Sequence, residues 1–188
     1  VGTFTFDAAG GSTINTSGTV TIQPVGDDFT GLGSNPLGAL TLTNVSGLTL
    51  GKAASSADGT SDVDVTLGSA LSVAGPIAVY GRNITLNGNL NTTGAAVPTD
   101  GDVLVQASGS ITLKASKTIN TDGGEVTLIS NKDRTTGGGI LLESGAGITT
   151  DGATTTGANI NLGSADNYAI GQLVGAATST PGGIILDG

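Results

Sequence analysis

Pairs of acidic side chains are the clearest candidates for chemistry in this sequence. They occur at Asp27 and Asp28, at Asp62 and Asp64, and at Asp100 and Asp102. A calcium ion needs six to eight oxygen ligands from several loop positions, and the tandem Gly-Gly-x-Gly-x-Asp pattern that would supply them is absent. We therefore interpret these carboxylates as solvated turn acids and predict no metal site.

Other catalytic residue types are scarce. The 188 residues include no His and no Cys, so the commonest general base, the commonest metal ligand and all thiol chemistry are missing. The two arginines, Arg82 and Arg134, are each expected in a turn without a neighbouring acidic cluster. Gly137-Gly138-Gly139 is followed by no Lys-Ser/Thr, so it is not a phosphate loop. We predict no enzyme, no catalytic residue and no cofactor-binding residue.

The charge balance excludes further function classes. Six Lys and Arg against 15 Asp and Glu give a net charge of -9, which disfavours nucleic acid and anionic membranes as partners. No apolar stretch is long enough for a membrane helix. Only 11% of the residues are charged, against an ordinary quarter or so, so Thr, Ser and Asn must supply the polar surface.

The elements that position these residues are predicted to be short strands. Apolar and polar residues alternate in short runs bounded by Gly, Asn and Asp, a pattern typical of β-strands, and no window shows a helical stripe. The expected strands are 19–22, 39–42, 48–50, 63–67, 71–73, 77–79, 84–86, 103–105, 111–113, 126–128, 140–142, 160–162 and 184–186.

One short sequence motif, here called the phrase, recurs along the chain. It consists of an apolar–any–apolar triplet, a short spacer, and a second apolar residue followed by Asn or Thr, then Thr, any residue and Gly. It is seen at 4–18, 84–94, 111–123 and 140–152. A unit of roughly 20 residues cannot bury its own apolar face and must stack on its neighbours. The repeat therefore predicts an all-β fold, a parallel β-helix or β-solenoid, over residues 1–188 as a single segment.

An antiparallel sandwich is the alternative. A sandwich normally shows hairpin turn dipeptides and large aromatic core residues, whereas this chain has two Tyr, three Phe and no Trp. We favour the β-helix, in which the outer residues of each triplet point inward and the middle one points outward. Leu86, Leu113, Leu128 and Leu142 are then expected in one inward stack.

Four segments interrupt the repeat and are predicted to be loop insertions, near 24–38, 52–62, 95–101 and 132–139. Insertions emerge at one edge of a solenoid, where recognition usually occurs, although neutral drift in a permissive turn is the simpler explanation. Phe29 and Leu32 in the first insertion could contact a sugar, but one aromatic is a poor platform. A carbohydrate-binding or polysaccharide-degrading module is therefore an alternative function.

Outward threonines suggest a further alternative, an ice-binding ladder. Thr3 and Thr5, Thr19 and Thr21, and Thr41 and Thr43 would form it if they lay on one face of consecutive rungs. The pattern is interrupted at Asp64 and Thr66, at Ala78 and at Asn161, so we do not expect a sustained ladder. Thr is also common in β-strands without any such function, because of its high strand propensity.

Segments such as 83–88, 109–113, 124–128 and 138–142 resemble the repeats of filamentous-haemagglutinin-type bacterial adhesins, which are often exported by two-partner secretion. The resemblance covers most of the chain and is weakest over 24–62. It implies a right-handed β-helix in a cell-surface or secreted, extracellular fibre that mediates attachment, with host or surface glycans as possible partners. Catalytic β-helices of the pectate-lyase type instead cluster Asp with Arg or Lys on one face, which this sequence does not suggest.

The sequence begins and ends within the strand pattern. We expect the segment to belong to a much longer repetitive protein, or to stack end to end with other copies, because bare strand edges recruit further strands.

Overall fold

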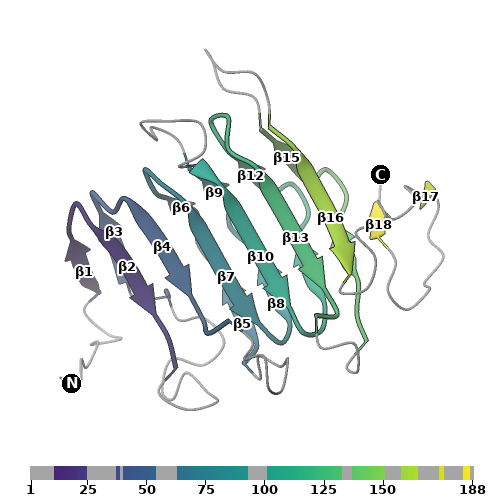
Figure 1. Cartoon of the computed structure of the whole chain (residues 1–188), viewed down its shortest axis with the longest axis horizontal. Helices are drawn as coiled ribbons and strands as arrows, with labels where there is room; N and C mark the ends of the chain where they lie inside the picture. The colour runs from purple at the N-terminus through teal and green to yellow at the C-terminus, as the bar shows by residue number, and fades with distance from the viewer. Residues whose placement is uncertain are drawn as a thin grey trace.

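The fold consists of parallel β-strands in stacked sheets (Figure 1). The computed structural model describes residues 11–24, 37–38, 40–53, 63–92, 101–132, 137–150 and 158–164, together with the backbone of 174–175 and 184–186. These residues contain no α-helix. Their strands are β1 (Ser12–Asn15), β2 (Thr19–Ile22), β3 (Leu40–Thr43), β4 (Gly47–Leu50), β5 (Val65–Leu67), β6 (Leu71–Ser72), β7 (Ile77–Gly81), β8 (Ile84–Leu86), β9 (Leu90–Asn91), β10 (Val103–Ala107), β11 (Ile111–Leu113), β12 (Thr118–Asn120), β13 (Val126–Ser130), β14 (Ile140–Leu142), β15 (Gly147–Thr149), β16 (Ile160–Ser164), β17 (Val174–Gly175) and β18 (Ile184–Leu186).

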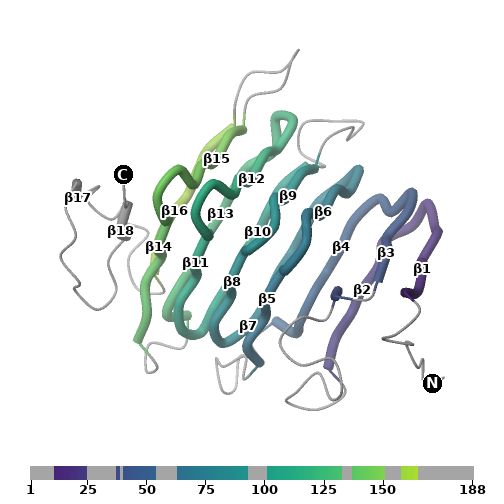
Figure 2. Tube along the Cα trace, turned by 180° about the vertical axis from the view of Figure 1, so that it is seen from behind, coloured from purple at the N-terminus to yellow at the C-terminus, as the bar shows by residue number. Residues whose placement is uncertain are grey.

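From β5 to β16, consecutive strands pass from sheet to sheet and then return. Sheet I has the order β17-β18-β14-β11-β8-β5, sheet II the order β15-β12-β9-β6, and sheet III the order β16-β13-β10-β7-β4-β2, while β1 and β3 pair separately. The chain runs through β8, β9 and β10 and then returns to place β11 beside β8. We call one such circuit a rung. Seen from behind, β14, β11, β8 and β5 lie side by side (Figure 2).

All pairings between described strands are parallel, which confirms the all-β parallel expectation and excludes the antiparallel sandwich for these residues. The expected strands are present wherever the structure describes them. The insertions predicted at 24–38, 52–62, 95–101 and 132–139 lie largely outside the described residues.

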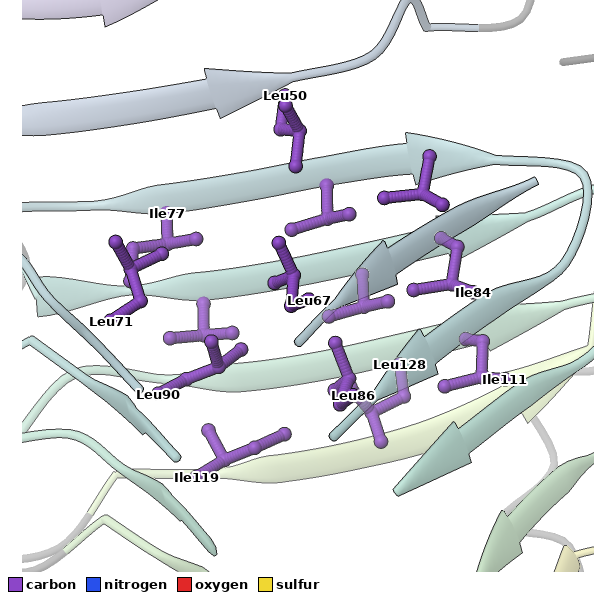
Figure 3. Packing of buried hydrophobic residues seen from close by; sticks show 14 of the residues in the cluster. Leu50, Leu67, Leu71, Ile77, Ile84, Leu86, Leu90, Ile111, Ile119 and Leu128 are labelled. Atoms are coloured by element: carbon purple, nitrogen blue, oxygen red, sulfur yellow. The ribbon is translucent and has the colours of Figure 1, made fainter. Parts of the chain in front are cut away.

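The register between neighbouring strands aligns residues of the same or similar type in successive rungs. In sheet I, Leu67, Leu86, Leu113 and Leu142 form one row, and Val65, Ile84, Ile111 and Ile140 form another. All eight side chains are buried. Figure 3 shows Leu67, Leu86, Ile84 and Ile111 of these rows among the packed core side chains. The middle residues of the same strands, such as Thr112, stay partly exposed. The inward–outward–inward prediction for the triplet is therefore confirmed.

The expected single stack of leucines needs one correction. Leu86, Leu113 and Leu142 share a row, but Leu128 belongs to β13 in sheet III, where it pairs with Val105 and Leu162. Leu128 is fully buried, so its inward orientation was predicted correctly and its sheet was not. The triplet 126–128 is the third strand of its rung, whereas 111–113 is the first.

Corners between strands bring successive rungs into close contact. Asn83 Oδ1 accepts a hydrogen bond from the Ser110 amide at 3.1 Å, and Asn89 Oδ1 accepts one from the Thr118 amide at 3.1 Å. Such contacts join residues 19 positions apart at Asp64–Asn83, 27 at Asn83–Ser110 and 29 at Asn89–Thr118. Rungs of unequal length can therefore stack, because only their strands and corners have to lie over those of the neighbouring rung.

Candidate functional site

Arg82 lies against an acidic residue that the sequence did not place near it. Its Nε donates to Asp64 Oδ1 at 2.9 Å, although the two residues are 18 positions apart in the chain. The same oxygen accepts from the Asn83 amide at 3.2 Å and from Asn83 Nδ2 at 3.0 Å. We expected no acidic cluster beside Arg82, and the described residues place one carboxylate there, a contact that we did not predict. This carboxylate ties two rungs together at a corner.

The other candidate acids are of interest as possible metal ligands. Asp102 Oδ1 accepts a hydrogen bond from the Glu125 amide at 2.7 Å, so this carboxylate also links adjacent rungs. Within the part of the chain that the structure describes, no three His, Cys, Asp or Glu side chains gather into a possible metal site. The candidate residues that lie outside that part are Asp27, Asp28, Phe29, Leu32, Asp62, Asp100 and Arg134.

A second ion pair links the turn after β14 to the turn after β11, in the preceding rung. Lys114 Nζ donates to Glu143 Oε1, and the Ala115 amide donates to Glu143 Oε2 at 3.0 Å. The Lys114 ammonium, followed by the Ala115 amide, lowers the pKa of Glu143 below its usual value. The Arg82 guanidinium, with help from Asn83 and against partial burial, likewise lowers the pKa of Asp64.

These lowered pKa values predict an acid-sensitive contribution to stability. A carboxylate with a lowered folded pKa stabilises the fold above its ordinary pKa, and that contribution is lost as the pH falls through the lowered value. The double variant Asp64→Asn, Glu143→Gln should therefore lose less stability than the wild type between about pH 6 and about pH 2.5. Because the Arg82–Asp64 pair is nearly half exposed, its share is about 1 kcal/mol or less.

Urea unfolding of both proteins at the two pH values measures this difference. Equal losses in wild type and double variant would show that neither pair stabilises the folded state.

Buried threonines explain the second half of the repeated phrase. Thr92, Thr121 and Thr150 follow sheet II and are almost completely buried. Each Oγ1 donates to a backbone carbonyl near the start of the next strand, at Gly101, Gly124 and Ala158 respectively. A buried hydroxyl is tolerated only with such a partner. The Thr of the phrase therefore closes the corner between sheets II and III, a role that sequence reasoning missed.

The outward threonines are arranged differently from the expected ladder. Thr21 lies beside Thr49 in sheet III, whereas Thr41 lies beside Thr13 and Thr43 beside Asn15 in the separate β1–β3 pair. The proposed set therefore does not share one face; Thr3 and Thr5 lie outside the described residues. Among the described residues, one outward row of three threonines runs through Thr66, Thr85 and Thr112 in sheet I, and it ends at Leu141.

A groove interrupts the wall of the rod between β3 and β6. Among the described strands, β3 pairs only with β1, and β6 only with β9. The Ala74 amide still donates to the Val45 carbonyl at 3.1 Å beyond the two strands. Between them lies a groove of about 400 Å³ lined by Leu40, Thr41, Leu42, Leu71 and Ser72 among others. Its lining is aliphatic and hydroxylic, without a titratable side chain among its described residues.

The described residues contain no helix long and apolar enough to cross a membrane. Comparison with family models, with curated proteins and with solved structures found no match to this chain.

Proposed function

We propose that this chain is a structural and adhesive segment of a large bacterial cell-surface or secreted fibre. In this proposal its parallel sheets form a right-handed β-solenoid whose unit of roughly 20 residues is enlarged by turn insertions. The observation that carries the proposal is the continuity of the apolar rows. In sheet III one row runs from Val20 through Leu48, Ile77, Val103 and Val126 to Ile160.

An architecture of stacked rungs is better suited to building a long rod than to forming an active site. Each added rung buries the apolar row of the preceding one, so the same local interaction extends the rod without a new fold. The side chains that join rungs, among them Asp64, Asn83, Asp102 and Glu143, form hydrogen bonds between neighbouring rungs. We propose that the role is non-enzymatic and extracellular, with neighbouring rungs or further copies stacked end to end as partners.

Light scattering over a dilution series tests the proposed assembly. The purified chain should form particles whose mass rises with concentration, because strand edges at both ends can accept further strands. The net charge of -9 should keep rods apart laterally. A monomer whose mass is unchanged at every concentration would contradict self-stacking.

The groove between β3 and β6 favours a second function, carbohydrate binding. Its backbone, hydroxyl and aliphatic lining offers a sugar hydrogen-bond partners and apolar contact. Saturable shifts of the Leu42 and Ser72 amide resonances on addition of an oligosaccharide would support this alternative. Unchanged resonances across a panel of surface glycans would reject it.

A further inference from the structure

The two ends of sheet III present strand edges that have no partner strand in the described residues. β2 is the last strand at one end and β16 the last at the other. Exposed edges are usually protected by charged residues or Pro. Neither β2, with sequence TVTI, nor β16, with sequence INLGS, contains one.

Several apolar side chains at these ends are also incompletely buried, although Val20 in β2 is buried. Ile160 in β16 is 44% exposed, whereas its row neighbour Val126 is fully buried. Partly buried hydrophobic residues that pack on the core include Ile14 and Ile22 at one end, and Ile148 and Leu162 at the other. The incomplete burial of these four side chains is what a rod end produces, because a row is covered only from one side there.

The register of the sheet fixes how the two ends would fit. β16 pairs with β13 through Val126–Ile160 and Leu128–Leu162, and β2 pairs with β4 through Val20–Leu48 and Ile22–Leu50. Since both strands belong to one parallel sheet, β2 of a second molecule runs in the same direction as β16. A shift along the rod places Val20 over Ile160 and Ile22 over Leu162, which continues both inward rows.

We propose that a second copy of this chain docks its β2 edge on β16, with Val20 over Ile160, Thr21 over Asn161 and Ile22 over Leu162. The inference rests on the proposed fibre-forming function and specifies its contact. The contact is head to tail, so it does not close and propagates into a filament. It continues the parallel ladder of sheet III and buries Ile160, which no described strand of that sheet covers, beside β18, which already extends sheet I past β14.

A cysteine cross-link tests this register, because the chain contains no Cys of its own. Thr21 and Asn161 both face outward and are exposed, and paired residues on neighbouring strands lie within disulfide range. Oxidation of the Thr21→Cys, Asn161→Cys variant should produce a ladder of covalent oligomers that a reductant collapses. The two positions lie at opposite ends of a six-stranded sheet, so a bond within one molecule is excluded.

Thr19→Cys with Asn161→Cys is the matched control. Thr19 shares the exposed, outward orientation of Thr21 but lies two residues out of register, at about 8 Å or more from Asn161 in the proposed contact. This variant should form little or no ladder. Equal ladders from both variants would overturn the register.

A charge variant separates this contact from the wider proposal. Ile160→Lys should abolish the concentration-dependent increase in mass, whereas Thr49→Lys, on the outer side of interior strand β4, should leave it unchanged. If assembly survives Ile160→Lys, and the Thr21→Cys, Asn161→Cys variant gives no covalent ladder, this contact is refuted while the fibre proposal stands. A concentration-independent monomer without cross-links would refute both.

Discussion

Replacing Leu113 with Asp is expected to unfold the rod at room temperature. Leu113 is fully buried in β11, between Leu86 and Leu142 of the neighbouring rungs. An unpaired carboxylate there costs several kcal/mol, whether it is buried charged or takes up a proton. That cost is comparable with the whole stability of an ordinary domain. Circular dichroism and urea unfolding should show lost β-structure or a strongly lowered midpoint.

Thr112→Asp is the matched control, because Thr112 is the neighbouring residue and points outward from the same strand. It should change the urea midpoint far less than Leu113→Asp. Comparable unfolding by the two substitutions, or a wild-type midpoint for Leu113→Asp, would contradict the inward row.

Replacing Gly75 with Ala is expected to cause the second large loss. A Cβ at Gly75 would lie 1.7 Å from the Ser46 carbonyl oxygen and 2.7 Å from its carbon. The corner cannot move freely, because the Ala74 amide donates to Val45 at 3.1 Å and the Leu48 amide to Pro76 at 2.9 Å. The rungs must separate there, so we expect a loss of about 2 kcal/mol or more, as for overpacked cores.

Gly147→Ala serves as its control. The nearest atom to a Cβ at Gly147 is Thr118 Cγ2, at 3.8 Å, an ordinary van der Waals distance. Its urea midpoint should stay close to wild type, with a change of about 0.5 kcal/mol or less. A Gly75→Ala protein as stable as Gly147→Ala would show that the two rungs are not in contact at Ser46.

Sequence reasoning located the strands with a full apolar–polar–apolar triplet. Sheets I and III are built from such triplets, for example 84–86 and 103–105, because both outer residues must face the core. Sheet II was largely missed, because only its strand β6 was expected, at 71–73. Its strands β9 and β12 contribute one inward apolar residue each, Leu90 and Ile119, and so give no alternation to detect.

Contacts between rungs were harder to predict than strands. The Arg82–Asp64 pair and the Leu128 row depend on which residues stack, and turn lengths that differ between rungs set this register. The repeated Thr was visible in the phrase, but its hydroxyl role at Thr92 and Thr121 needed the carbonyl partners at Gly101 and Gly124. The groove between β3 and β6 had no sequence signal at all.

Electron microscopy of the purified chain, with diffraction from its aligned assemblies, tests the central claim most directly. We expect single, unbranched filaments one rod wide, with a repeat of about 4.8 Å along the filament axis, because the strands lie across the rod and stack along it. Filament length should fall on dilution and in the Ile160→Lys variant. A monodisperse particle at all concentrations, with β2 and β16 ordered and exposed to solvent, would contradict the account.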